Sequence, residues 1–437
     1  MILTNVVKLY PNAKTRKRLD FYILMRDKYW NISLSKWNDM YDTHSIECHL
    51  VKTVFTPQID KKGILKHTKK GKAIVKEKNY YSNPSPSYQL IQTEIEQNKS
   101  NLDYLVPAHM IRLVVKDLGR AFDAFFDKKR SDIHHPKFKD LNDHVTGSYK
   151  DDQACIKNGK LRLTKGILDS NDYSLIRTRP KLPDQQLKLV TIVRKDGNYY
   201  AMIAYDEPEK HLMQTGLNDG VDVNVGHFNS CGYRLNILPK RLDYLYKRTN
   251  HYQRMLGIKR FRNEDYKKSK RYATIKAHLK RDHVKIVNYQ HDIIQKYTTY
   301  LVKYHDEIYI EDLDVKHMLM SHVASKGMHR SLFGYFRQVL TYKCKLYRRK
   351  LHIVDRFFPS TQMCPNCGCI KTGDDRITLH GNKKYGTKHN EFHCNECGYT
   401  ADRDAKVPAT LMRYSDYTMK HIRKLQHKQA TVINGLA

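Results

Sequence analysis

Two Cys-x-x-Cys pairs near the C-terminus constrain the fold of this chain more than any other feature of its sequence. The pairs are Cys364 with Cys367 and Cys394 with Cys397, and a glycine follows each pair. Four thiolates at such spacings bind one structural zinc ion in a tetrahedral site, so the two pairs must meet in space. Cys369 and His393 offer alternative ligands beside the pairs, and we interpret Cys369 as a bystander thiol.

Cysteine usage and the absence of long apolar runs predict an intracellular protein. Paired thiols in intracellular proteins are more often metal ligands than disulfides, and the cysteine total of nine is odd. The chain lacks an apolar run of about 18 residues, as a membrane span needs, and its first residues lack the apolar core of a signal peptide. We therefore expect a soluble, monomeric protein of the bacterial cytoplasm or nucleoid, or of the nucleus for a eukaryotic or viral gene.

An excess of basic residues predicts a polyanionic partner. Lys and Arg number 79 against 45 Asp and Glu, which gives a net charge of +34. Such a chain repels itself unless a polyanion such as nucleic acid neutralises it. A solvated basic surface, as in ribosomal or chromatin proteins, is the alternative. Tyrosines, of which there are 31, can stack on unpaired bases, and the basic stretch 240–281 is the candidate for phosphate contacts.

Strand and helix patterns alternate in the N-terminal half. Residues 2–9 predict a strand and residues 15–41 a helix, whereas the polar, lysine-rich residues 57–104 predict a loop or insertion. An amphipathic helix is predicted from Pro107, and several strands between residues 154 and 206. This half therefore predicts a β-barrel or small sheet with helices inserted after its first strand.

The C-terminal half has an α/β order. Strand patterns at 219–226, 307–312 and 351–356 are separated by helical patterns, which predicts a parallel or mixed sheet covered by helices. A last helix is predicted from about residue 409 to residue 425.

Acidic residues stand at strand ends and before the last helix. Asp222 alternates with the valines of GVDVNVG and so lies on the opposite face, Glu311 ends the next strand, and Asp402 and Asp404 precede the last helix. Mg²⁺ prefers oxygen ligands, and two such ions about 4 Å apart can activate water to attack a phosphodiester. For each residue taken alone, a solvated acid is the alternative.

The order of four motifs resembles the TnpB proteins of bacterial insertion sequences. The motifs are GVDVNVG, IYIEDLDVKHML, DRFFPSTQMCPNCG and FHCNECGYTADRD. They equally resemble the Fanzor proteins of eukaryotes and viruses and, more distantly, the compact type V CRISPR effectors. KLYPNAKTRKRL near the N-terminus, and VPAHMIRLVVKDLGRAFDAFF followed by HPKFK, extend the resemblance over most of the chain.

The resemblance implies a multidomain α/β architecture. Its parts are an OB-like wedge β-barrel (1–14 and 140–212), an inserted helical recognition lobe (15–139), a RuvC nuclease domain of RNase H-like fold (213–360 and 401–437) and a zinc-binding insertion (361–400).

The implied activity is that of an RNA-guided, metal-dependent, transposon-associated DNA endonuclease. A guide RNA pairs with one strand of double-stranded target DNA beside a short duplex motif, and the RuvC site cuts by a two-metal mechanism. Asp222, Glu311 and Asp404 are the implied catalytic residues and magnesium ligands, with Asp402 as runner-up, and the four cysteines bind one structural zinc. Asp404 is also favoured because it could cap the last helix, whereas a cap at Asp402 would place Pro408 in the helix interior.

One segment departs from the family pattern Asp-x-Asn-Ala-Ala. Lys406, Val407 and Pro408 stand where the family has Asn-Ala-Ala, and we expect Lys406 to pair with Asp404 and weaken metal binding. The alternatives are therefore a catalytically weak or inactive RNA-guided DNA-binding protein, such as a domesticated repressor, or a transposase. Glu311 stands at its usual place, which puts the chain nearer to the TnpB-like branch.

Overall fold

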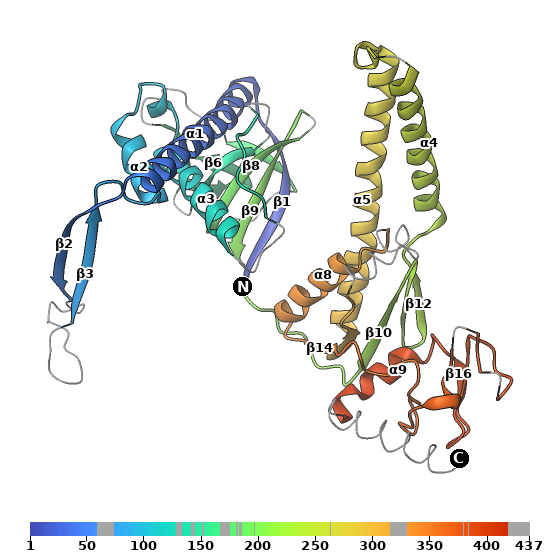
Figure 1. Ribbon diagram of the computed structural model, residues 1–437. Helices are drawn as coiled ribbons and strands as arrows, with labels where there is room; N and C mark the ends of the chain where they lie inside the picture. Colours follow the sequence, from blue (N-terminus) through green and yellow to red (C-terminus); the bar gives the residue numbers. More distant parts are fainter. Residues whose placement is uncertain are drawn as a thin grey trace. The chain divides into compact units, whose positions relative to one another are not determined.

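The computed structural model of the chain divides into two compact units, residues 1–207 and residues 208–437 (Figure 1). It describes residues 1–58, 74–127, 133–140, 145–150, 153–166, 175–180, 182, 186–195, 197–262, 264–314, 330–378, 380–382 and 384–417. Part of the predicted lysine-rich loop and residues 418–425 of the predicted last helix lie outside these ranges. Within the described residues, every helix is too short or too polar to cross a lipid bilayer.

The first unit is built on a seven-stranded antiparallel sheet. Its strands, in sheet order, are β4 (Val145–Lys150), β8 (Leu187–Lys195), β9 (Asn198–Asp206), β1 (Ile2–Tyr10), β7 (Ile176–Arg179), β6 (Lys160–Leu163) and β5 (Ala154–Lys157). Buried and more exposed side chains alternate along β9, because one face of the sheet packs on the core. The predicted β-rich region with helices after its first strand is present, and closure of the sheet into a barrel stays a prediction.

Three helices complete the core of this unit. They are α1 (Ala13–Ile46), α2 (Tyr88–Gln97) and α3 (Ala108–Phe126). Met110, Val114 and Leu118 of α3 are buried along one stripe, as the amphipathic pattern predicts. Trp37 of α1 stacks on Phe122 of α3 with ring centroids 4.2 Å apart, which joins the two helices.

A hairpin and a helix occupy much of the segment predicted to be a loop. Strand β2 (Leu50–Pro57) pairs antiparallel with β3 (Val75–Tyr81), and α2 follows. Strand β2 precedes the predicted segment except for Pro57. The loop prediction is wrong for β3 and α2, and the alternative of an insertion stays a prediction. In β3 the lysines obscured the β-forming Val75, Tyr80 and Tyr81. The hairpin extends from the end of α1, away from the seven-stranded sheet (Figure 1).

The second unit contains a five-stranded mixed sheet. Its order is β12 (Tyr233–Asn236), β11 (His227–Ser230), β10 (Asn218–Asn224), β13 (Glu307–Glu311) and β14 (Lys350–Val354). Strands β10 to β12 form an antiparallel meander, whereas β10, β13 and β14 run parallel. The connections contain α4 (Lys240–Arg262), α5 (Lys270–Tyr304) and α8 (Phe333–Leu346), because parallel strands need long crossovers. The predicted α/β order is confirmed.

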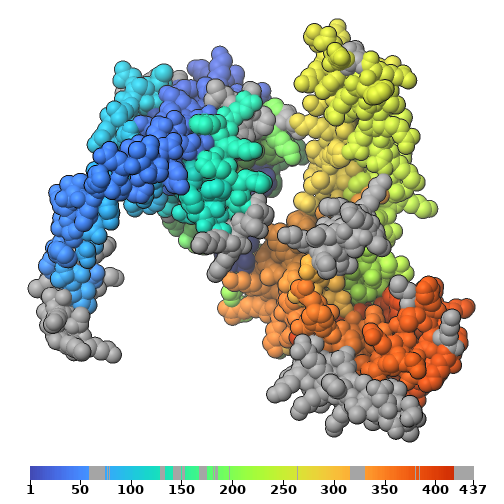
Figure 2. Space-filling model, viewed as in Figure 1, coloured from blue at the N-terminus to red at the C-terminus, as the bar shows by residue number. Residues whose placement is uncertain are grey.

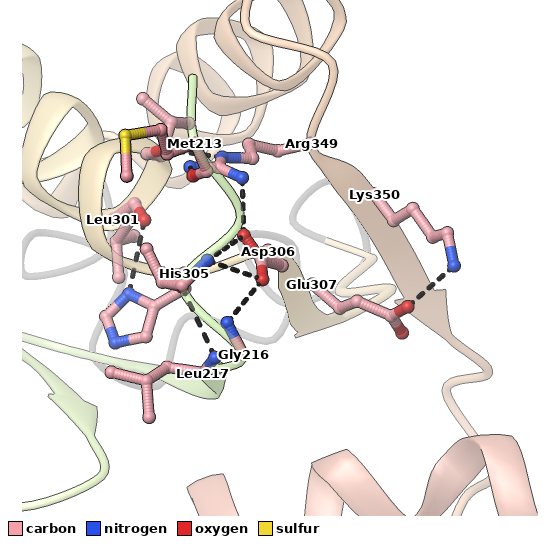
Figure 3. A network of polar contacts seen from close by, with 11 residues as sticks. Met213, Gly216, Leu217, Leu301, His305, Asp306, Glu307, Arg349 and Lys350 are labelled. Carbon is pink, nitrogen blue, oxygen red and sulfur yellow. Dashed lines mark hydrogen bonds and ion pairs between the residues drawn. The ribbon is translucent and has the colours of Figure 1, made fainter. Parts of the chain in front are cut away.

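A polar network around the buried Arg349 side chain joins the segments at the amino ends of the parallel strands (Figure 3). Asp306 accepts a hydrogen bond from the Gly216 N–H (2.7 Å) and pairs with Arg349. Arg349 also donates to the carbonyl oxygens of Val302 and Met213, both at 2.9 Å. One buried guanidinium therefore connects the segments that lead into all three strands, and charge-assisted bonds of this kind set their register.

Short elements follow β14. Strands β15 (Glu391–His393) and β16 (Thr400–Asp402) pair antiparallel, and α9 (Val407–Met412) packs on β10.

In the described part of the whole chain, the 3₁₀ turns are η1 (Asp103–Leu105), η3 (Tyr266–Lys268), η4 (Gly373–Asp375) and η5 (Arg413–Asp416). The last helix begins two residues earlier than predicted and passes at residue 413 into η5, so the described part of the prediction is too long.

Candidate metal centre

Two parallel strands bring Asp222 and Glu311 to the same edge of the sheet. Strands β10 and β13 stay in register up to Val221 opposite Ile310, so the next residue of each strand is one of the two acids. The carboxyl ends of parallel strands are where α/β sheets commonly hold their ligands. Strand register thus explains how two acids far apart in the sequence become neighbours.

Helix α9 carries the third acid to this edge. The helix crosses β10 at Gly220, where a Cβ atom would stand 2.1 Å from the carbonyl oxygen of Pro408. Burial, followed by the charges of Glu311 and Asp404, raises the pKa of Asp222 to about 7. The three predicted carboxylates are therefore close enough to repel one another.

Each of the three carboxylates accepts a hydrogen bond from one other side chain. The pairs are Asn224 Nδ2 to Asp222 Oδ2 (2.6 Å), Ser360 Oγ to Glu311 Oε1 (2.5 Å) and Arg403 Nε to Asp404 Oδ1 (3.1 Å). Contacts of this kind orient carboxylates that bind metal. Sequence reasoning missed Ser360 and Gly220, because neither residue type reveals a contact with a distant segment.

Asp402 has a different task. Its Oδ1 accepts hydrogen bonds from the N–H groups of Asp404 and Ala405, both at 3.0 Å, and thereby caps the turn before α9. The predicted cap at Asp404 is therefore wrong. Pro408 lies in the first turn of α9, where a missing N–H costs little. One carboxylate oxygen of Asp402 is engaged in this cap, and the assignment of Asp404 as the third carboxylate stays a prediction.

Lys406 does not form the pair predicted for it. Its Nζ donates to the carbonyl oxygens of Ser360 and Met363, both at 2.8 Å, and lies 4.3 Å from the centroid of the Phe392 ring. The side chain is 1 % exposed, and this burial lowers its pKa to about 7. The prediction that Lys406 pairs with Asp404 is wrong, since the apolar stem carries the amine into the protein interior.

The contacts of Lys406 connect the acidic centre with the cysteine element. Ser360 accepts from Lys406 through its carbonyl oxygen and donates to Glu311 through its hydroxyl. Phe392 belongs to β15, between the two cysteine pairs. One short path of contacts therefore leads from the cysteine element to a carboxylate of the candidate centre.

The four predicted cysteines form a compact group. Their sulfur atoms all lie within 4.8 Å of one another, with Cys364 and Cys397 3.7 Å apart and Cys367 and Cys394 3.5 Å apart. Zinc–sulfur bonds of about 2.3 Å in a tetrahedron separate the sulfur atoms by about 3.8 Å, so the group fits one zinc ion. Among the described residues, these four cysteines form the group of possible metal ligands whose ligand atoms all lie within 4.8 Å of one another. The ligand oxygens of Asp222, Glu311 and Asp404 do not all meet that distance.

Both cysteine pairs share one backbone turn. The N–H of the first cysteine donates to the carbonyl five residues later, and the glycine N–H donates back to that cysteine carbonyl. Gly368 and Gly398 have φ of +78° and +69°, the left-handed region that favours glycine. The Tyr399 N–H lowers the pKa of Cys397 to about 6, whereas burial raises the pKa of Cys364 and of Cys367. Cys369 lies outside the group of four, as predicted.

Comparisons with known proteins agree with these features. Residues 202–322 match the family OrfB_IS605, described as "Probable transposase", and residues 333–406 match the family described as "Cas12f1-like, TNB domain". Relatives named "Putative RNA-guided DNA endonuclease" occur in Streptomyces pristinaespiralis (23 % identity; 69 % of this chain, 70 % of the relative) and, as InsQ, in Escherichia coli K12 (26 %; 70 % and 74 %). The TnpB-like protein L79 of Acanthamoeba polyphaga mimivirus is 28 % identical over 33 % of this chain and 26 % of its own length.

The chain belongs to the TnpB family. A solved Cas12f1–sgRNA–target DNA complex contains a chain with the same fold, at a TM-score of 0.51 and 11 % identity, covering 94 % of this TnpB chain and 98 % of the other. The cysteine element and the three acids lie within or beside the two matched segments of the TnpB chain.

Gly220→Ala tests the close approach of α9 to β10. The added Cβ meets the Pro408 carbonyl oxygen, so we expect a loss of about 1–3 kcal/mol in the free energy of unfolding, measured by denaturant titration. The matched control is Gly257→Ala in α4, where a Cβ meets nothing within 4 Å, and it should be neutral or stabilising. Equal stability of Gly220→Ala and wild type would contradict the packing described above.

Asp222→Asn tests the cost of a negative charge at this buried position beside two other carboxylates. In metal-free protein the pKa of Asp222 is about 7, against about 3.9 in an unfolded chain, so its contribution to stability is complete below pH 4 and lost as pH rises to 7. The asparagine variant should therefore melt several degrees higher than wild type at pH 8, and at the same temperature at pH 4. Added Mg²⁺ should close the gap at pH 8 by stabilising wild type alone.

The exposed Asp374→Asn serves as the control for that experiment and should melt like wild type at both pH values. A metal-free Asp222→Asn protein no more stable than wild type at pH 8 would show that burial and the neighbouring charges do not disfavour the ionised Asp222 carboxylate.

Cys364→Ser tests the zinc site. Structural zinc binding is coupled to folding, so we expect less than one zinc per chain by elemental analysis and a lower melting temperature. Chelation of wild type should have the same effect. Cys369→Ser, which removes the neighbouring thiol outside the group, should retain zinc and stability. Full zinc content in Cys364→Ser would remove that residue from the ligand set.

Proposed function

We propose that the chain is an RNA-guided, metal-dependent DNA endonuclease that cuts double-stranded DNA complementary to a bound guide RNA, beside a short duplex motif. The observation that carries this proposal is the convergence of Asp222, Glu311 and Asp404 at one edge of a mixed sheet. The strand order, an antiparallel meander followed by two parallel strands, agrees with the RNase H-like fold expected for a RuvC domain.

The acidic residues fit a site for divalent cations. Asp222 is 9 % exposed and is destabilised by two neighbouring negative charges, which a cation would neutralise. In this proposal the three carboxylates hold two Mg²⁺ ions about 4 Å apart. When bound, such ions make a nucleophile from water at neutral pH and stabilise the leaving oxygen of a phosphodiester.

The chain's own side chains position this chemistry. Asn224 and Ser360 hold the carboxylates of Asp222 and Glu311 by hydrogen bonds, and α9 holds Asp404 against β10. In this proposal Asp222, Glu311 and Asp404 are the catalytic residues and magnesium ligands, and the four cysteines hold structural zinc. Asp402 shapes the turn and takes no part in the reaction.

The partners follow from charge and from the relatives. The net charge of +34 favours polyanionic partners, and two of the relatives named above are called putative RNA-guided DNA endonucleases. Helices α4 and α5 are rich in Lys and Arg and are joined by the Arg248–Asp282 ion pair (2.5 Å). They offer a basic surface for phosphates of a heteroduplex, while base pairing reads the sequence.

An inactive guided DNA-binding protein is the second candidate, and the structure removes one reason for it. That candidate depended on Lys406 neutralising the third acid. The Lys406 amine instead binds two carbonyl oxygens, and the ion pair of Asp404 is made with Arg403 (3.1 Å).

Cleavage of matched DNA tests the proposed activity. The chain is purified from cells that carry its native flanking DNA, the copurified RNA is sequenced, and duplex DNA matching that RNA is incubated with the complex and Mg²⁺. Wild type should cut the matched duplex and spare a scrambled one. Glu311→Gln and Asp222→Ala should cut at least roughly a thousandfold more slowly and bind the duplex as tightly as wild type.

Asp374→Asn is the matched control and should cut at the wild-type rate. Wild-type complex that binds matched DNA and never cuts it would establish the inactive candidate. Strand-transfer products from donor DNA would establish the transposase.

A further inference from the structure

The turn that follows β14 is bound to Glu311 at both of its ends. Before the turn, Val354 pairs with Glu311 in the register of β13 and β14. After it, the Ser360 hydroxyl donates a hydrogen bond to the Glu311 carboxylate (2.5 Å). Residues 355–359 therefore pass beside one of the proposed metal ligands. In the space-filling view this stretch belongs to the orange part of the second unit (Figure 2).

Further contacts hold the turn in one shape. The Arg356 guanidinium pairs with Asp312, the residue that follows Glu311, at 3.3 Å. The Phe357 N–H donates a hydrogen bond to Asp355 Oδ1 (2.8 Å), and the Phe358 side chain is buried in the core. The backbone on both sides of Phe357 is therefore fixed by contacts with the rest of the unit.

This fixed turn exposes one large apolar side chain. Phe357 is 69 % exposed, whereas its neighbour Phe358 is 5 % exposed. An extended chain covers at most about 3.6 Å per residue, so the Phe357 Cα lies within about 11 Å of the Cα atoms of Val354 and Ser360. A single exposed Phe is ordinary on a protein surface. At this position, however, the ring is within reach of a substrate bound at Glu311.

The chemistry of the acidic centre indicates what the ring would meet. Under the proposed function, on which this inference rests, Asp222, Glu311 and Asp404 act on a phosphodiester of DNA. One strand rises by about 3.4 Å per nucleotide in a duplex, so a reach of about 11 Å covers the first few nucleotides beside that bond. Aromatic side chains stack on bases whose faces are free, and pairing of a guide with one target strand leaves the other strand unpaired.

We propose that Phe357 stacks on an unpaired base of the DNA strand that is cut, within a few nucleotides of the scissile phosphodiester. The stacked base holds the strand in place, so that the phosphodiester stays at the carboxylates. In a duplex the faces of a base are covered by its neighbours, and Phe357 therefore favours a separated strand over an intact duplex. The contact reads no sequence, because every base has a flat face.

Cleavage by the complex of the chain with its copurified RNA tests this contact. Phe357→Ser should cut the matched duplex about tenfold more slowly than wild type, because the strand is held less well. Phe357→Trp keeps a ring and should cut at nearly the wild-type rate, whereas the apolar Phe357→Leu should be as slow as Phe357→Ser. All three variants should melt like wild type, since the side chain is largely exposed.

A fluorescent base locates the contact without cleavage. 2-Aminopurine fluoresces less when it stacks on a ring, and it can replace one base at a time along each target strand. In an Asp222→Ala complex, which should bind DNA and leave it uncut, adding Phe357→Ser should raise the fluorescence at positions beside the cut. Positions elsewhere in the target should fluoresce as before.

Tyr233→Ser is the matched control. Tyr233 is 50 % exposed and belongs to β12, and β12 and β14 are the two outer strands of the five-stranded sheet. Strands lie about 4.8 Å apart, so four spacings separate this control from β14 by about 19 Å. The variant loses an exposed ring far from the turn and should keep the wild-type cutting rate and fluorescence.

The remaining outcomes separate this inference from the proposed function. Wild type that cuts no matched DNA would overturn the function; an oligothymidine containing 2-aminopurine then becomes the probe, and weaker quenching by Phe357→Ser than by wild type still supports the contact. Equal cutting and equal fluorescence in Phe357→Ser and wild type overturn the inference. So does a defect that Phe357→Leu repairs, a lower melting temperature of Phe357→Ser, or a fluorescence change confined to labelled guide RNA.

Discussion

The second unit depends on the parallel pairing of β10 with β13. At the amino ends the Asp306–Arg349 network joins three incoming segments, and at the carboxyl ends the same register delivers Asp222 and Glu311 side by side. A shift of one residue would turn one acid to the opposite face of the sheet. The polar network and the acidic centre therefore lie at opposite ends of the same two strands, β10 and β13.

The start of helix α9 connects the cysteine element with the sheet. Gly220 lets the helix lie directly on β10, and Lys406 binds the segment that precedes Cys364. Ser360, in that segment, reaches Glu311. The TnpB chain thus assembles its three acids from two strands and one helix, and the position of the helix depends on the turns around the four cysteines.

The sequence predicted the parts of this arrangement that depend on local pattern. Strand alternation placed Asp222, and cysteine spacing predicted the group of four, because each signal lies within a few residues. The sequence did not predict the roles of three other residues. Asp402 caps a turn, Lys406 is buried, and Ser360 binds the distant Glu311. Residues 75–81 escaped for another reason, since lysines in a strand imitate the composition of a loop.

The burial of Lys406 also ties two neighbouring parts of the chain to one another. A lysine amine is costly to enclose unless its hydrogen bonds are made, and here both acceptors lie in the segment leading into the first cysteine pair. That segment and the start of helix α9 therefore stabilise one another. A substitution in the cysteine turns can thus act on the acidic centre without touching a carboxylate.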